Sequence, residues 1–89
     1  MNFEFDPDKS ASNRLKHGID FIEAQELWDV RAVVVRSDRT GELRYARIAM
    51  HHDGNLWTAI YTHRETNVRI ISVRKASRSD RKLYEENIS

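Results

Sequence analysis

The second half of the chain alternates between apolar and polar positions with the two-residue period of β-strands. Four runs rich in β-branched and aromatic residues begin at Arg31: RAVVVR, LRYARIAM, LWTAIYT and VRIISVR. The breaks between them are polar, and the middle one contains Asp53-Gly54, a dipeptide typical of tight turns. Connections this short join antiparallel neighbours, because a parallel crossover needs a dozen residues or more. The pattern therefore predicts a four-stranded antiparallel meander.

The first part of the chain has helical spacing instead. An Asp-Pro pair at Asp6 is typical of an N-cap followed by the first helical turn. The predicted helix runs to about Lys16 and ends at Gly18, which suits the left-handed C-cap conformation. Its apolar content is thin, and we expect Ala11 and Leu15 to form one narrow stripe against the core.

A second helix is predicted from Asp20 to about Val30. Asp20 and Glu23 have the spacing of a capping box, and Ile19 can pack on Ala24 as a hydrophobic staple. The apolar positions recur at helical spacing: Phe21, Ala24, Leu27 and Trp28.

Both ends of the chain add one more element. The segment NFEF before Asp6 alternates and suggests a short N-terminal edge strand. Ser77 to Ile88 is predicted as a helix, because Ser77 and Asp80 have a capping-box spacing. Leu83, Tyr84 and Ile88 would anchor it. The predicted fold class is α+β: two N-terminal helices, the four-stranded meander with or without the edge strand, and a C-terminal helix, with the helices covering one sheet face.

Composition limits the kind of protein that this can be. The 89 residues suffice for one domain, predicted over residues 1–89, and 33% of them are charged. There is no cysteine, which excludes disulfides and thiolate chemistry and fits a reducing cytoplasm. No run approaches the roughly 18 apolar residues of a membrane span, and the acidic N-terminus does not resemble a signal peptide. We therefore expect a cytoplasmic protein without a membrane partner.

The charge is unevenly distributed. Residues 1–30 hold three basic and seven acidic side chains, whereas residues 31–89 hold twelve basic and seven acidic ones. The segment RIISVRKASRSDRKLYEE places basic residues where the last strand runs into the last helix. Cations at a helix start oppose the helix dipole, so an external anion such as phosphate would complement them. A solvated helix surface with Arg81–Glu85 and Lys82–Glu86 pairs is the alternative.

The two terminal blocks resemble the BrnT family of toxin–antitoxin toxins. In the first block the matching residues are Phe3, Asp6, Lys9, Asn13, Lys16, His17, Gly18, Phe21, Glu23 and Ala24. In the last block they are Tyr61, Thr62, Arg64, Arg69, Ile70, Ile71, Ser72, Arg74, Ala76, Arg81 and Tyr84, and Arg44 and Ile48 match on a middle strand. The chain departs from the family pattern at Phe5, Ala49, Val73 and Asp80, where the family has tryptophan, glycine, alanine and glutamate.

The resemblance implies a RelE-like, metal-independent ribonuclease fold with RNA as substrate and no cofactor. It further implies a ribbon-helix-helix antitoxin as partner, DNA binding only through the toxin–antitoxin complex, and repression of its own promoter. A dimer or a 2:2 complex is left open. The alternative function is a non-catalytic module that binds a partner within a DNA-binding repressor complex. A non-catalytic RNA-binding protein is also left open, although no RNA-binding motif is present.

Metal-free RNA cleavage needs a base near the 2′-hydroxyl, an acid near the leaving oxygen and cations on the phosphorane. The candidate catalytic residues are Arg64, Arg74, His63, Lys16 and His17. The candidate RNA or phosphate ligands are Arg44, Arg69, Arg78, Arg81 and Tyr84, because guanidinium groups match phosphate geometry. For the histidines and Tyr84 the alternative is a structural role.

The segment His51-His52-Asp53 raises the question of a metal site. Adjacent strand residues point to opposite faces, and no further ligand stands at a useful spacing in the sequence. We therefore predict no metal.

Overall fold

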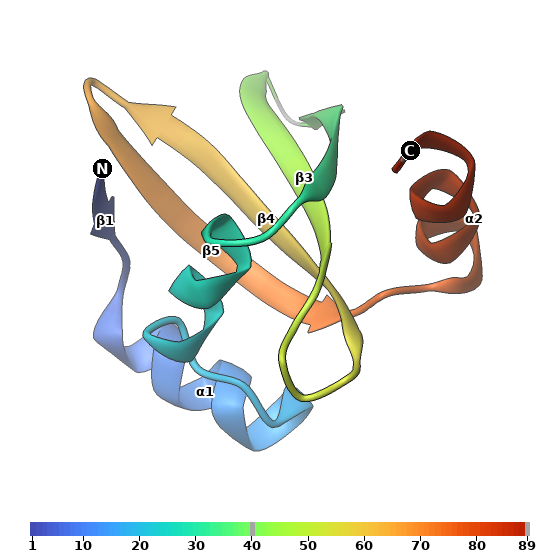
Figure 1. The fold of residues 1–89 in the computed structure, drawn as a ribbon. Coiled ribbons are helices and arrows are strands. Elements are labelled where there is room, and N and C mark those ends of the chain that lie inside the picture. Colours follow the sequence, from blue (N-terminus) through green and yellow to red (C-terminus); the bar gives the residue numbers. More distant parts are fainter. Residues whose placement is uncertain (40, 89) are drawn as a thin grey trace.

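The computed structural model describes residues 1–39 and 41–88 (Figure 1). Its elements in chain order are β1 (Asn2–Glu4), α1 (Pro7–His17), the 3₁₀ helix η1 (Glu23–Trp28), β2 (Ala32–Arg39), β3 (Glu42–Met50), β4 (Leu56–Arg64), β5 (Asn67–Lys75) and α2 (Arg78–Asn87). Neither α1 nor α2 has the length and apolar character needed to cross a lipid bilayer.

The strands form one mixed sheet in the order β1-β5-β4-β3-β2. The four predicted strands appear as β2 to β5, each antiparallel to the next. The short first strand pairs with β5 in the parallel sense, with Phe3 opposite Val68. The fold class is therefore α+β with a five-stranded mixed sheet. Parallel pairing is possible because α1, η1 and the strands β2 to β4 separate β1 from β5 along the chain.

The prediction of two N-terminal α-helices is wrong, because the second segment is a six-residue 3₁₀ helix. Phe21, Ala24 and Leu27 are buried and lie three residues apart. A spacing of three suits the three-residue turn of a 3₁₀ helix as well as it suits an α-helix, so the pattern did not separate the two. Asp20 caps the segment as expected, accepting hydrogen bonds from the N–H groups of Ile22 (3.0 Å) and Glu23 (2.7 Å).

The limits of α1 agree with the prediction, but its buried face does not. Asp6 is the N-cap, and Gly18 is the left-handed C-cap with φ 86°. Leu15 is 90% exposed and Ala11 is exposed, so the expected apolar stripe is wrong. The helix instead buries the polar side chains of Ser10 and Asn13. Polar atoms suit this position, because α1 lies against the backbone of β5 and of the following loop.

Asn13 covers the part of β5 that β1 does not pair. β1 pairs only with residues 67–69 of β5, so the backbone beyond is a sheet edge. The N–H of Val73 donates to the Asn13 side chain (3.2 Å), and the Asn13 amide donates to the carbonyl of Ile19 (2.8 Å). Ser10 accepts from the N–H of Phe21 in the same way (2.9 Å). One helix face thus satisfies the strand edge and fixes the start of η1.

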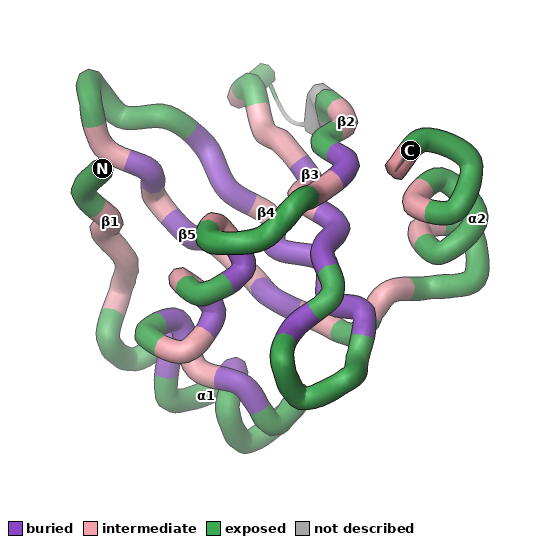
Figure 2. Tube along the Cα trace, viewed as in Figure 1, coloured by how far each residue is buried: buried purple, intermediate pink, exposed green. Residues whose placement is uncertain are grey.

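The core lies between the sheet and the α1–η1 layer (Figure 2). Its buried members are Ile19, Phe21, Ala24, Leu27, Ala49, Trp57, Ala59, Tyr61, Val68, Ile70 and Val73. On β4 the core residues Trp57, Ala59 and Tyr61 alternate with Thr58, which bonds to Asp80 of α2. The last helix therefore lies on the opposite sheet face, where it buries none of its own residues. The expectation that all helices cover one face is wrong.

Candidate functional site

Four of the predicted site arginines lie on the sheet face opposite the main core. Arg74 pairs with Thr58 and Arg69 with Thr62 across β4 and β5, and both threonines alternate with core residues. Arg64 follows Thr62 by two positions, and Arg44 precedes the core-side Tyr45. Side chains alternate along β3 and β4, and the bulge in β5 between Arg69 and Arg74 shifts the alternation there by one residue. Arg44, Arg64, Arg69 and Arg74 therefore share one face, called here the arginine face.

Three of these arginines lie near the β4–β5 turn. The Arg69 guanidinium is 3.3 Å from the Glu4 carboxylate, and the Arg44 guanidinium is 3.2 Å from the Glu42 carboxylate. Asn67 donates to Glu4 (3.1 Å). This hydrogen bond, together with Arg69 and Arg64, lowers the pKa of Glu4 against the opposing effect of burial. These contacts hold the guanidinium groups of Arg44 and Arg69 in place near the β4–β5 turn.

Arg74 stands apart from this group, beside α2. It forms an ion pair and hydrogen bond with Asp80, which also accepts from the Thr58 hydroxyl (3.0 Å) and the Ser77 N–H (3.1 Å). Thr58 and Thr62 are four residues apart on β4, so the backbone positions of Arg74 and Arg69 beside them lie about 13 Å apart at roughly 3.3 Å per residue. The arginines therefore share one face but form two groups along it.

The Asp80 carboxylate has a dual structural role. It completes the capping box of α2 with Ser77, as the sequence predicted, and it orients Arg74. Burial opposes its ionisation, but hydrogen bonds from Arg74, Ser77 and Thr58 outweigh burial and lower the pKa of Asp80 below its ordinary 3.8. The residue that departs from the family pattern is thus part of the site.

We expect the contribution of Asp80 to stability to depend on pH. Because its pKa is lower in the folded chain, the contribution is complete above the unfolded pKa of about 4 and is lost as the pH falls through the lower folded value. Asp80→Asn should lower the free energy of unfolding at pH 7 by about 1–3 kcal/mol, and the difference from wild type should shrink towards pH 3. Urea unfolding at both pH values measures this. Glu85→Gln, on the exposed side of α2, is the control, and a pH-independent Asp80→Asn deficit would contradict the assignment.

The three candidates on α2 follow Arg74 along the chain, on the helix that Asp80 joins to Thr58 on the arginine-face side of the sheet. Arg78 and Arg81 are exposed, while Tyr84 is half-buried. Arg78 opens the helix directly after the Ser77 cap, close in sequence to Arg74. Basic side chains therefore continue from β5 onto α2.

The predicted acid–base residues lie elsewhere. Lys16 and His17 line an open cleft of about 270 Å³ between α1 and β5, together with Lys9. Ile71 and Ser72 form its other side, next to the bulge that interrupts the β4–β5 register.

His63 lies on the core face of the sheet rather than on the arginine face. Its ring makes edge contacts with Tyr45 (5.3 Å between centroids) and Tyr61 (5.7 Å). The structure therefore does not bring His63 together with the arginines.

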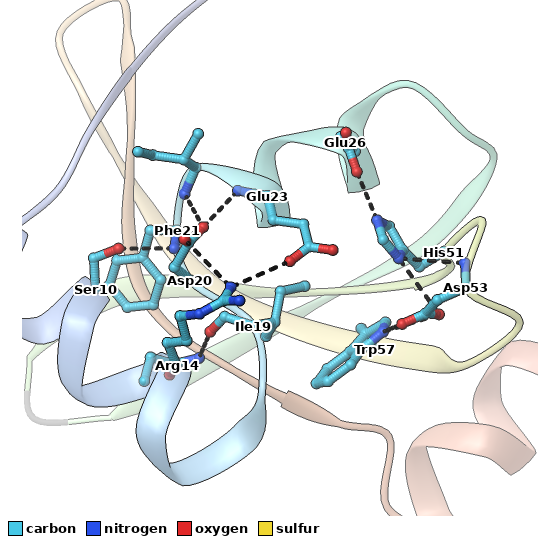
Figure 3. A network of polar contacts seen from close by, with 12 residues as sticks. Ser10, Arg14, Ile19, Asp20, Phe21, Glu23, Glu26, His51, Asp53 and Trp57 are labelled. Atoms are coloured by element: carbon cyan, nitrogen blue, oxygen red, sulfur yellow. Dashed lines mark hydrogen bonds and ion pairs between the residues drawn. The ribbon is translucent and has the colours of Figure 1, made fainter.

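A polar cluster joins His51, His52 and Asp53 of the β3–β4 turn to η1, a connection that the sequence did not indicate. The His51 Nε2 atom lies 2.7 Å from a Glu26 oxygen, as Figure 3 shows. The His52 Nε2 atom lies 3.0 Å from the same oxygen. Asp53 lies 3.4 Å from His51 Nδ1 and accepts from the Trp57 indole N–H (3.2 Å). The hydrogen bond from His51 is the main cause of a lowered pKa of Glu26.

The argument that neighbouring histidines point to opposite faces is wrong here. β3 ends at Met50, so His51 and His52 belong to the turn, and their ring centroids are 3.9 Å apart. The third member, Glu26, is 25 positions before His51, a separation that no short motif captures.

Comparison with known families agrees with this architecture. The sequence model described as "Ribonuclease toxin, BrnT, of type II toxin-antitoxin system" matches residues 5–80. The match defines the class of the protein as a ribonuclease toxin of a type II toxin–antitoxin system. The chain belongs to the BrnT family.

A solved structure supports the same fold. The 1.1 Å crystal structure of the Brucella abortus ribonuclease toxin BrnT is similar with a TM-score of 0.71 and 23% sequence identity, over 88% of this chain and 99% of that chain. A comparison with curated proteins found no match.

Proposed function

We propose that this protein is a cytoplasmic, metal-independent endoribonuclease with a RelE-like mechanism that cleaves RNA and thereby inhibits translation. The observation that carries the proposal is the placement of Arg44, Arg64, Arg69 and Arg74 on one sheet face. Four guanidinium groups on one surface can bind successive phosphates of a single RNA strand. Their separation into two groups suits a strand that crosses the face better than a single bound phosphate.

In this proposal the arginines stabilise the charge that develops on the phosphate. The RNA 2′-hydroxyl attacks the adjacent phosphorus, the bond to the 5′-oxygen breaks, and the phosphorane carries extra negative charge between these events. Arg64 and Arg74 contact the reacting phosphate or its neighbour, and Arg44, Arg69, Arg78 and Arg81 hold the flanking backbone. Tyr84 lines the same surface on α2.

Lys16 and His17 are the proposed acid–base pair. Ser72 lies two positions from Arg74 on the same side of β5, and it also borders the cleft that Lys16 and His17 line. A strand crossing the edge of β5 at Ser72 would therefore pass from the arginine face into the cleft. For His63, packed on two tyrosines, the structural role is the better assignment.

The test is RNA cleavage by the purified chain in excess EDTA. We expect cleavage to persist and to leave 2′,3′-cyclic phosphate and 5′-hydroxyl ends, because these are the products of attack by the 2′-hydroxyl. Expression of the chain without its antitoxin should arrest growth. Intact RNA under all conditions in which the chain is folded would contradict the proposal.

We also propose a ribbon-helix-helix antitoxin as partner, with autoregulation through the joint complex. The arginine face is a suitable surface for an acidic antitoxin segment that replaces the RNA phosphates. The ion pairs that Arg69 and Arg74 already make favour a second candidate function, a non-catalytic binding module. The binding-module function would be favoured if the antitoxin bound operator DNA more tightly in the presence of this chain while RNA stayed uncleaved.

A further inference from the structure

Side chains from two separate segments converge beside η1. Glu23 and Glu26 come from η1, and His51 and His52 come from the β3–β4 turn. One carboxylate or imidazole atom from each lies within 4.8 Å of the others. This cluster lies on the core side of the molecule and shares no residue with the arginine face.

The hydrogen bonding within the cluster is that of a ligand set. Both Nε2 atoms are directed at one Glu26 oxygen, so each position requires either a proton or a cation between nitrogen and oxygen. Behind His51, Nδ1 lies 3.4 Å from the Asp53 carboxylate and 3.4 Å from the Asp53 backbone N–H, and the carboxylate is itself held by Trp57. A carboxylate on the remote nitrogen is the usual arrangement behind metal-binding histidines, since it orients the ring and raises its basicity.

We propose that Glu26, His51 and His52, with Glu23 as a fourth ligand, form a binding site for a divalent transition-metal ion of the Zn²⁺ class. Ligand atoms 2.0–2.2 Å from a tetrahedral ion are about 3.3–3.6 Å apart. The observed separations of 2.7 Å, 3.0 Å and at most 4.8 Å bracket this value, so small side-chain rotations suffice. Two imidazoles with carboxylates favour Zn²⁺, Ni²⁺ or Co²⁺ over Mg²⁺ and Ca²⁺, which prefer oxygen ligands.

The burial of the ligands indicates what the ion does. The His51 side chain is 1% exposed, whereas those of His52 and Glu26 are 72% and 48% exposed. His51 is therefore a buried, fixed ligand, whereas His52 and Glu26 lie at the surface. The ion would enter from this exposed side. Glu23 also lies 3.9 Å from Arg14, a contact that metal binding would exchange for coordination. A bound ion would pin η1 to the β3–β4 turn and stabilise the fold, independently of RNA cleavage.

Titration of the full chain with ZnCl₂ tests the site. Isothermal calorimetry should give one saturable site per chain, and Zn²⁺ at a hundredfold excess over its dissociation constant should raise the Tm by about 10 °C, reversibly with EDTA. Co²⁺ in place of Zn²⁺ should give the visible absorption bands of a four-coordinate ion. His52→Ala and Glu26→Gln should each weaken binding at least tenfold, while His17→Ala, which alters a histidine outside the cluster, should bind as wild type does.

The two test variants change exposed side chains, so circular dichroism should show wild-type folding. Absence of a saturable site would overturn the proposal, as would equal Zn²⁺ affinity in wild type, His52→Ala and Glu26→Gln. Loss of affinity in His17→Ala equal to that in His52→Ala would assign the ion elsewhere and would also overturn it. The RNA cleavage assay in EDTA is run at a temperature where the metal-free chain is folded. Failure of the ribonuclease proposal can then be distinguished from failure of the metal-site proposal.

Discussion

Arg64→Ala is expected to lower the rate of RNA cleavage by about 10²–10³-fold and to abolish growth arrest in cells. The factor corresponds to loss of one positioned donor to a developing oxyanion. Arg64 is exposed at the end of β4, so its removal should leave the free energy of unfolding within about 0.5 kcal/mol of wild type. Single-turnover cleavage of a labelled RNA, with thermal unfolding in parallel, measures both effects.

A matched control tests whether the effect depends on the position of the arginine or only on the loss of one positive charge. Arg14→Ala removes an arginine of α1 that is 62% exposed and lies near Asp20 and Glu23, away from the arginine face. It should cleave RNA as wild type does. Equal cleavage by the Arg14 and Arg64 variants would remove Arg64 from the mechanism.

Arg74 requires a different comparison, because Asp80 depends on it. Arg74→Ala would leave the largely buried Asp80 carboxylate without its cation, so lost activity could reflect lost structure. Arg74→Lys keeps a cation near Asp80 but removes the planar fork that binds phosphate through two donors. We therefore expect Arg74→Lys to lose cleavage with little loss of stability.

Asn13→Ala is expected to destabilise the fold by about 2–4 kcal/mol and to lower the Tm by at least about 10 °C. The substitution removes the acceptor of the Val73 N–H and the donor to the Ile19 carbonyl, both at a buried position. The Val73 N–H is then a buried donor without a partner, which costs more than the hydrogen bond itself contributes. Equilibrium unfolding in urea measures the change.

Two further variants test this explanation. Ser12→Ala, at an exposed position of the same helix, should change stability by less than about 0.5 kcal/mol. Asn13→Asp keeps an acceptor for Val73 but cannot donate to Ile19 when ionised, so its cost should remain substantial. An Asn13→Ala variant as stable as Ser12→Ala would contradict the edge-capping role.

The comparison of Asn13 with Leu15 shows where sequence patterns mislead. Apolar residues were expected to mark the buried face of α1, yet Leu15 is exposed and Asn13 is buried. A helix that packs on a strand edge meets backbone N–H and C=O groups, and these require polar partners. Hydrophobic periodicity detects helices that pack on apolar surfaces, so it could not identify this one's orientation.

The candidate site was predictable only in part. The arginines of β4 and β5 could be placed on strands from the sequence. Simple alternation, however, puts Arg69 and Arg74 on opposite faces, and only the bulge in β5 brings them onto one. Their separation into two groups, and the engagement of Arg74 with Asp80, depend on where α2 lies. The cluster of Glu26, His51 and His52 was not predictable, because its members come from segments about 25 residues apart.

The local elements could be read from the residues alone: the Asp6 and Gly18 caps of α1, the Ser77–Asp80 capping box of α2 and the four strands of the meander. These depend on side chains and backbone groups a few residues apart, whose geometry is the same in any fold. Long-range packing sets the rest: β1 joins β5 in parallel, η1 is a 3₁₀ helix, α2 covers the face opposite α1, and two histidines meet a distant glutamate. Those outcomes depend on which surfaces pack together across the whole chain, a competition that local spacing does not encode.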